Sequence, residues 1–126
     1  MKIDAVLLRE IEARALASSD VEVCGLLLGD DGRIEAAPAT ANVAERPADS
    51  FEIDSAELFA ALRAERAGGP RVIGHYHSHP NGSTEPSARD LAAAEPGKLW
   101  LILGNGPSRL WLMTATGFVE RELCCD

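Results

Sequence analysis

Basic residues are scarce in this sequence of 126 residues. Lysine and arginine total 12, against 20 aspartates and glutamates, and the formal net charge is −8 at pH 7. A general nucleic-acid binder should present a basic face to the phosphate backbone. The charge balance therefore argues against a nucleic-acid partner.

Long apolar runs are also missing. No stretch approaches the roughly 20 consecutive apolar residues that a transmembrane helix needs. The first four residues, Met1 to Asp4, already include an acidic side chain and lack the apolar core of a signal peptide. We therefore expect no membrane partner and a cytoplasmic protein.

Cysteine is sparse as well, with three residues in all. A small, odd number of cysteines fits a reducing compartment. Cys24 lies in an apolar run and is expected in the core. Cys124 and Cys125 are adjacent in an acidic tail, where we expect a frayed, reactive terminus; metal binding and oxidation are the alternatives.

The length and the 46% hydrophobic content suit one globular domain. Helical and strand patterns alternate along the chain. Helices are expected at 4–18, 54–67 and 87–94, and strands at 21–28, 33–37, 39–43, 51–53, 71–76, 99–103, 109–113 and 118–123. No repeat or linker divides the chain, so we predict one α/β domain over residues 1–126.

The second helix has a clear start and an apolar face in the sequence. Asp54 and Glu57 have the spacing of a capping box. Leu58, Phe59 and Leu62 recur at helical intervals and are expected to face the core.

All three histidines fall at alternate positions, His75, His77 and His79, near the end of a predicted strand. Alternate residues of a strand point to the same face. His77 and His79 would project side by side, with backbones roughly 6–7 Å apart. Asp90, from the following helix, would complete a set of two histidines and one aspartate. Three protein ligands with an open fourth position are typical of a catalytic zinc.

These residues also have a purely structural interpretation. A His-x-His pair alone is a weak metal signal. Ser87 could be a helix N-cap, with Asp90 at the third helical position reaching back to it. The two interpretations are compatible, because a cap can also place a ligand.

The full pattern is His77-Ser78-His79, seven residues, Ser87, two residues and Asp90, preceded by Glu22 in Glu-Val-Cys-Gly. It resembles the signature of the JAMM/MPN zinc metalloproteases, and the chain is most similar to their small prokaryotic members. The resemblance implies a single domain with a curved, mixed β-sheet flanked by helices, an architecture like that of cytidine deaminases.

The resemblance also implies roles for five residues. One Zn²⁺ per chain would be bound by His77, His79 and Asp90. Glu22 would act as general base and then general acid, whereas its position alone suggests an exposed acidic residue at a strand start. Ser87 would donate a hydrogen bond to the developing oxyanion.

By this resemblance the chain is a metallopeptidase or isopeptidase. It would hydrolyse an amide bond after the C-terminal Gly-Gly of a ubiquitin-like or sulfur-carrier protein. The alternatives are a non-catalytic scaffold, whose relatives typically lose ligands, a general metallopeptidase, and a nucleic-acid-associated branch of the fold. A zinc deaminase would be expected to use a Cys-x-x-Cys pair, which the sequence lacks.

The residues near the motif are expected to have structural roles. His75 is predicted to be a core histidine or one that supports a ligand. Ser78 should point away from the ligands, and Tyr76, Trp100 and Trp111 should pack in the core. The loops at 44–50 and 81–86 should flank the site.

Overall fold

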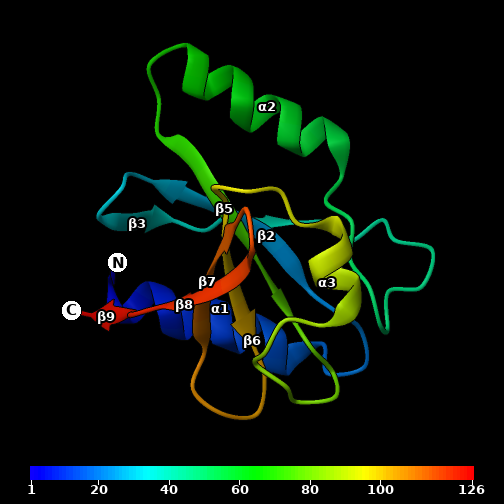
Figure 1. Cartoon of the computed structure of the whole chain (residues 1–126). Coiled ribbons are helices and arrows are strands. Elements are labelled where there is room, and N and C mark those ends of the chain that lie inside the picture. Colours follow the sequence, from blue (N-terminus) through cyan, green and yellow to red (C-terminus); the bar gives the residue numbers. More distant parts are fainter.

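A curled, mixed sheet forms the centre of the computed structural model, which describes residues 1–126 (Figure 1). The strand order is β8-β7-β6-β5-β2-β3-β1-β9, and β4 pairs with β2. The strands are β1 Lys2–Ile3, β2 Cys24–Gly29, β3 Arg33–Ala36, β4 Ala39–Thr40, β5 Arg71–Ser78, β6 Leu99–Leu103, β7 Arg109–Thr114, β8 Gly117–Arg121 and β9 Cys124–Cys125. The helices are α1 Ala5–Ala17, α2 Ser55–Arg66 and α3 Ala88–Ala93. This arrangement confirms the predicted α/β fold with a curved, mixed sheet.

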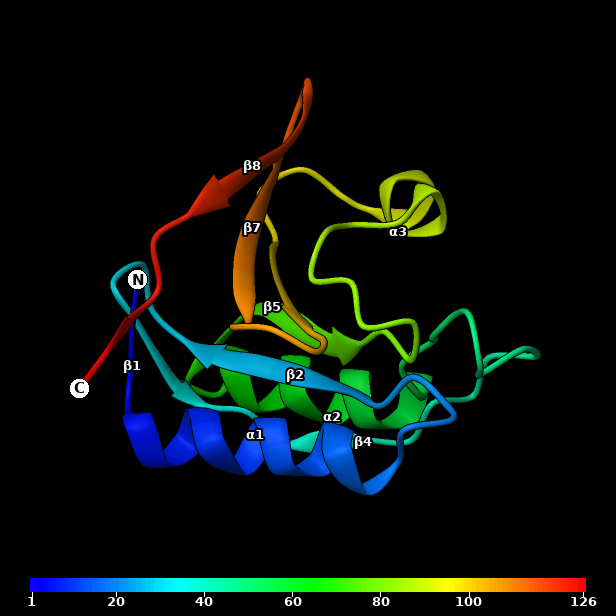
Figure 2. The same cartoon turned by 90° about the horizontal axis from the view of Figure 1, so that it is seen from below.

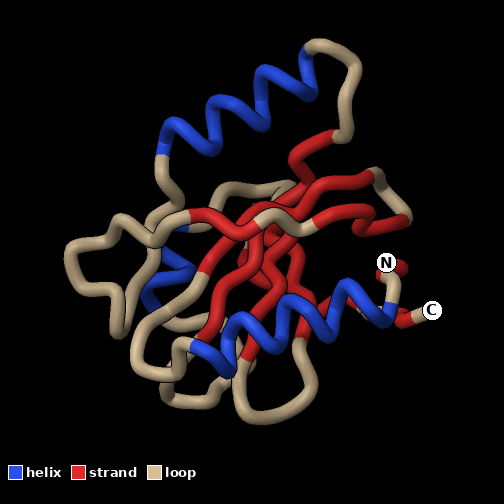
Figure 3. The backbone as a smooth tube through the Cα atoms, turned by 180° about the vertical axis from the view of Figure 1, so that it is seen from behind, coloured by secondary structure: helices blue, strands red, loops and turns tan.

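Helices cover both faces of the sheet, and alternation along β5 separates the two faces. Tyr76 is fully buried on the face of α1, where Arg14 donates a hydrogen bond of 2.9 Å to its hydroxyl. His75 lies on the other face, in a cavity that Leu58 and Leu62 of α2 also line. Figure 3 shows α1 crossing one side of the sheet while α2 lies apart from it on the opposite side.

The centre of the sheet is the pairing of β5 with β2 on one side and β6 on the other. The β2–β5 pair is antiparallel and the β5–β6 pair is parallel. Gly74 lies opposite Leu99, and a Cβ at Gly74 would collide with the main chain of Leu99. Close approach of β6 to β5 therefore requires glycine here. The most buried apolar side chains of the main core are Ile3, Ile11, Leu27, Ile34, Leu101 and Leu110.

The helix caps follow the sequence expectations with one exception. Asp4 accepts hydrogen bonds from the first turn of α1, and Asp54 accepts one from the main chain of Glu57. The predicted return bond from Glu57 to Asp54 is wrong. The Glu57 carboxylate accepts from the main chain of Ala41 at 2.9 Å, because the N–H of Asp54 already bonds the carbonyl of Ala41.

The expected apolar face of α2 is only partly correct. Phe59 is 59% exposed, and no residue of α2 is fully buried. The helix meets the sheet through the half-buried Leu58 and Leu62, which line the cavity beneath it. Phe59 lies one position beyond Leu58, which turns its ring out of this contact.

The predicted fraying of the C-terminus is wrong, because the tail is paired. Cys124 and Cys125 form β9, which lies parallel to β1. Figures 1 and 2 show the two chain ends side by side at this edge of the sheet. Both thiols are exposed, whereas Cys24 is buried as expected. Arg33 adds a two-pronged ion pair to Asp126.

Two further differences concern a short element and the packing of one tryptophan. The predicted strand at 51–53 is reduced to a single bridge between Asn42 and Ile53. Trp100 is buried as expected, but Trp111 is only half-buried, and its indole N–H donates to the carbonyl of Thr84 at 3.0 Å. None of the three helices combines the length and apolar character that a bilayer crossing requires.

Candidate metal centre and active site

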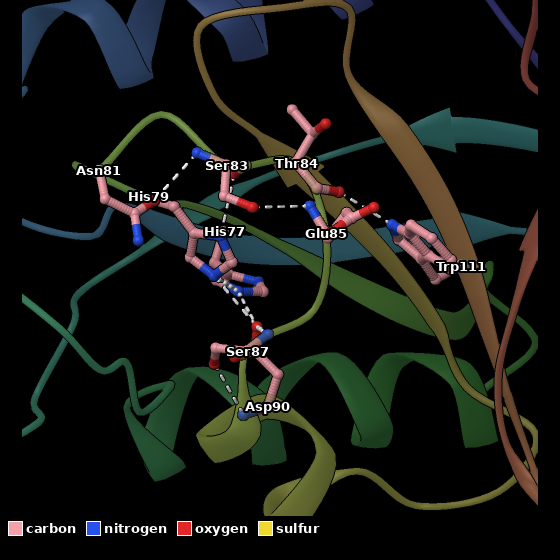
Figure 4. Close-up of polar contacts among 9 residues, drawn as sticks. All are labelled: His77, His79, Asn81, Ser83, Thr84, Glu85, Ser87, Asp90 and Trp111. Carbon is pink, nitrogen blue, oxygen red and sulfur yellow. Dashed lines mark hydrogen bonds and ion pairs between the residues drawn. The ribbon is translucent and has the colours of Figure 1, made fainter.

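The site begins with two histidines at the end of β5. His77 lies in the strand, opposite Cys24 of β2 and Ile102 of β6. His79 follows the strand end, and its N–H still bonds the carbonyl of Leu103 at 2.9 Å. The extended backbone therefore continues through His79, and both imidazoles point to the same side. Their Nε2 atoms lie 3.1 Å apart (Figure 4).

Asp90 brings a carboxylate to the same point from α3. Its Oδ2 lies 3.1 Å from Nε2 of His77 and 3.0 Å from Nε2 of His79. The same oxygen accepts from the N–H of Ser87 at 2.9 Å, and the Ser87 hydroxyl accepts from the N–H of Asp90 at 3.0 Å. This is a reciprocal capping box, so the structural interpretation of Ser87 and Asp90 is confirmed. The cap itself holds Asp90 against the histidines.

The three groups share protons in the metal-free protein. Nδ1 of His79 donates to the carbonyl of Ser83 at 3.0 Å, so Nε2 is the nitrogen that faces Asp90. Burial lowers the pKa of His77, which favours the neutral imidazole. Burial alone would raise the pKa of Asp90, but hydrogen bonds from His77 and His79 outweigh it and lower that pKa. Burial alone would also lower the pKa of His79, but its hydrogen bond to Asp90 and the charge of that carboxylate outweigh burial and raise it. A metal ion would replace the shared protons and meet one carboxylate oxygen and two imidazole nitrogens.

The three atoms fit a zinc ion. Zinc bonds of about 2.0–2.1 Å in tetrahedral geometry separate neighbouring ligand atoms by roughly 3.3–3.4 Å. The observed separations of 3.0–3.1 Å need only a small widening. Converging acceptors repel one another unless a positive charge lies between them, and either protons on the imidazoles or a metal ion can supply it. His77, His79 and Asp90 therefore have the chemistry and spacing of a metal centre.

Glu22 is the second carboxylate that reaches the histidine pair. It precedes β2 by two residues, so the expectation that it lies within the strand is wrong. Its carboxylate lies within 4.8 Å of the ligand nitrogens of His77 and His79. The side chain is buried and its Oε1 has no hydrogen-bond partner. Burial is the largest of the effects that raise its pKa from 4.5 to about 7.

Distance distinguishes the two carboxylates. Asp90 lies within hydrogen-bond range of both imidazoles, whereas Glu22 meets only the wider limit of 4.8 Å. Asp90 therefore suits a ligand and Glu22 a group that works beside the metal. A pKa near 7 lets a carboxyl both accept and donate a proton at neutral pH.

Comparison with known proteins identifies the family. A model described as prokaryotic homologs of the JAB domain matches residues 4–114. The chain belongs to this JAB family.

Its relatives agree with the family assignment. A desampylase of Haloferax volcanii is 42% identical over 116 residues, which are 88% of this chain and 83% of the relative. A probable TtuB-protein conjugate cleaving protease of Thermus thermophilus is 32% identical over 107 residues, 85% of this chain and 72% of the relative. The JAB1/MPN domain protein of Archaeoglobus fulgidus has the same fold, with a TM-score of 0.66 at 23% identity over 100% of this chain and 97% of that one. The predicted resemblance is confirmed, and the relatives' names support a hydrolase of the peptidase class.

Around the candidate centre of this JAB chain, aromatic rings enclose His77. The ring of Phe51 stacks on His77, with centroids 4.3 Å apart. His75 contacts Trp100 at 4.2 Å and stays outside the ligand cluster, and burial lowers its pKa to about 3. His75 is thus outside the ligand set as expected, but it is half-buried and its Nδ1 has no hydrogen-bond partner, so it is not a satisfied core histidine. The Ser78 hydroxyl accepts from the N–H of Val23, also as expected for a structural residue.

The JAB site lies between two cavities. One, of about 360 Å³, is lined by His79, Val21 and Asn105 among others. The other, of about 700 Å³, lies between the segment around Phe51 and helix α3, and Asp90 is in its wall. Each cavity therefore has one residue of the ligand cluster in its wall.

Sequence reasoning missed two residues at this site. The sequence pattern places Phe51 in the expected strand 51–53 and Asn42 in the expected strand 39–43, and neither pattern indicates a role at the site. Asn42 donates to the carbonyl of Glu22 at 2.8 Å across 20 residues of sequence. The only sign of their role in the sequence is that Asn42 and Phe51 flank the polar loop 44–50. Many loops without a functional role have the same flanking residues.

Proposed function

We propose that the chain is a zinc-dependent isopeptidase that hydrolyses the amide bond after the C-terminal Gly-Gly of a ubiquitin-like or sulfur-carrier protein. The observation that carries the proposal is the convergence of His77, His79 and Asp90 beside the buried carboxylate of Glu22. The names of the relatives, desampylase and conjugate-cleaving protease, support this class of substrate.

The metal ligands in this proposal are His77, His79 and Asp90, with one Zn²⁺ per chain. When bound, zinc supplies Lewis acidity, which makes water nucleophilic near neutral pH. The protein holds the ligand side chains in the orientation that the metal needs. Nδ1 of His79 is held by the Ser83 carbonyl, and Asp90 is held by its helix cap.

Glu22 moves the proton. With a pKa of about 7, its carboxylate accepts a proton from the attacking water. The same carboxyl then gives the proton to the leaving amine, which departs neutral. Its Oε1 has no competing hydrogen bond within the protein, so it is free for this exchange.

Ser87 stabilises the developing oxyanion. Its Oγ already accepts from the N–H of Asp90 at 3.0 Å, so the hydroxyl hydrogen remains available to donate. The helix cap fixes the serine in place before the substrate arrives. A preorganised donor of this kind is worth about 10²–10³-fold in kcat.

The proposed preference for glycine follows from crowding around the metal ligands. Phe51 stacks directly on His77, and the loop at 81–86 is tied to His79 and to Trp111. A Gly-Gly tail can approach such a centre closely because it has no side chains to clash. An extended tail is also the form that flanking segments bind by main-chain hydrogen bonds.

The test uses a ubiquitin-like carrier whose Gly-Gly tail bears one extra amino acid or an isopeptide-linked lysine. Intact mass is followed with enzyme, with enzyme and a zinc chelator, and with Glu22→Gln. Glu10→Gln, an exposed position on α1, is the matched control. We expect loss of the adduct with wild type and the control only, and no loss with chelator.

Two other outcomes would contradict the proposal. If the adduct stays intact while unrelated unfolded peptides are cut, the chain is a general metallopeptidase. If zinc is bound at the site but neither kind of substrate is cut, the non-catalytic scaffold is the better description.

A further inference from the structure

We propose that Asn42 is a positioning residue that sets the location of the Glu22 carboxylate through the main chain of Glu22. The inference rests on the proposed function, because it assumes that Glu22 transfers the proton. It concerns a residue outside the metal ligands and outside the capping box, 20 residues away from Glu22 in the sequence.

The Asn42 side chain uses its full hydrogen-bonding capacity. Its Nδ2 donates to the carbonyls of Glu22 at 2.8 Å and Ser50 at 3.1 Å. Its Oδ1 accepts from the N–H groups of Ala44 and Glu52, both at 3.0 Å. An amide has two donor hydrogens and two acceptor lone pairs, so every position is filled. A flipped amide would place oxygen against two carbonyls, so the orientation is fixed as well.

The main chain of Glu22 has a second bond to the same segment. Its N–H donates to the carbonyl of Pro47 at 2.6 Å. Both polar groups of the Glu22 backbone therefore end on the segment 42–52. That segment is braced internally, because the N–H and hydroxyl of Ser50 both donate to the carbonyl of Arg46.

The backbone groups of Glu22 itself depend on this segment. The next residue, Val23, is held by β5, because its N–H donates to the Ser78 hydroxyl and its carbonyl accepts from the N–H of Ser78, whereas the ladder between β2 and β5 begins at Cys24. The carboxylate cannot orient itself, since its Oε1 has no partner. The same segment carries Phe51, which stacks on the ligand His77 at 4.3 Å. One folded segment therefore contacts both the proposed base and the proposed metal site. Asn42 bonds the segment to Glu22 and also bonds the segment to itself.

The experiment removes the donor while keeping the acceptor. Asn42→Asp retains an oxygen for Ala44 and Glu52 but turns a second oxygen toward the carbonyl of Glu22. Ser50→Ala is the matched control, because it loses one bond inside the segment and keeps the carbonyl that Asn42 uses. Hydrolysis of the carrier adduct gives kcat and KM, and elemental analysis gives zinc per chain.

For Asn42→Asp we expect kcat to fall by about 10–100-fold, because a catalytic group is displaced. KM should change by less than about threefold, since substrate binding is not altered directly. Zinc content should equal that of wild type, and Ser50→Ala should keep kcat within about threefold of wild type. If the new carboxylate prevents folding, Asn42→Ala, which removes the donor without adding charge, decides the question by the same readouts.

A double variant separates positioning from general structural support. If Asn42 acts through Glu22, adding Asn42→Asp to Glu22→Gln should cause no further loss of kcat. The same fold-loss in both backgrounds, or wild-type kcat in the single variant, would overturn the inference. Failure of wild type itself to cleave the adduct would instead remove the proposed function.

Discussion

Replacing Glu22 by glutamine should stabilise the metal-free protein while it removes most activity. The Glu22 side chain is buried, with 4% exposure, and its Oε1 is unpaired. Burial is the main cause that raises its pKa from 4.5 to about 7, so the folded protein holds this proton more tightly than the unfolded chain does. The contribution to stability is therefore full below pH 4.5 and is lost as pH rises through about 7.

The size of the effect follows from the pKa shift. The difference between 7 and 4.5 is about 2.5 units, and each unit is worth about 1.4 kcal/mol, which sets an upper limit of roughly 3 kcal/mol. Glutamine leaves this buried position without a hydrogen-bond partner, which offsets part of the gain. We therefore expect glutamine, which is neutral at every pH, to add about 1–2 kcal/mol at pH 8. For a chain of this length that raises Tm by about 3–10 °C.

The assay is thermal unfolding by circular dichroism in the presence of a zinc chelator at pH 4 and pH 8. Wild type is compared with Glu22→Gln and with Glu10→Gln, which changes an exposed carboxylate. The gain should be present at pH 8, shrink at pH 4 and be absent in the control. A parallel assay should show kcat lowered by about 10²–10⁴-fold with zinc retained. A Glu22→Gln protein that is no more stable than wild type at pH 8, or gains equally at both pH values, would refute the reasoning.

Three other substitutions test the site and its frame. Asp90→Asn should keep the helix cap but lose most of the bound zinc, because it removes the one anionic ligand; stoichiometric zinc by elemental analysis would contradict the ligand assignment. Gly74→Ala should cost about 1–3 kcal/mol in urea unfolding, because the new methyl group collides with the main chain of Leu99. Ser78→Ala should cost about 1–3 kcal/mol in the same assay, since it leaves the N–H of Val23 without its acceptor, and an unchanged midpoint would argue against that bond.

The parts of the site that the sequence predicts are those set by local geometry. Alternation along one strand brings His77 and His79 to the same side, and the observed Nε2 separation of 3.1 Å agrees with it. The spacing of Ser87 and Asp90 predicts a helix cap, which the structure shows. Both arguments need only a few neighbouring residues and a known backbone geometry. The sequence offers Asp90 as a third ligand and the family resemblance assigns it that role, but no local rule places one helix against another strand.

The parts that escape prediction depend on contacts distant in sequence. The strands β1 and β9 have two residues each, too few to show a period of two, and they exist because the two chain ends meet. Asn42 likewise gains its importance from the carbonyl of Glu22, which only the folded chain brings near. Phe59 satisfies the helical pattern yet is exposed, because α2 contacts the sheet over a narrow line.

Buried side-chain atoms that lack a hydrogen-bond partner are concentrated around the candidate centre. Four buried side-chain atoms lack a hydrogen-bond partner, and they belong to Glu22, His75, His77 and Trp100. His75 and Trp100 are paired in register, and His77 is two residues along the same strand, so the group lies together around the candidate centre. Each unpaired atom costs stability, and the other buried side-chain nitrogen and oxygen atoms have hydrogen-bond partners. Such a cost is concentrated where a metal ion, water and substrate can offset it, which is the pattern expected of a site built for binding and chemistry.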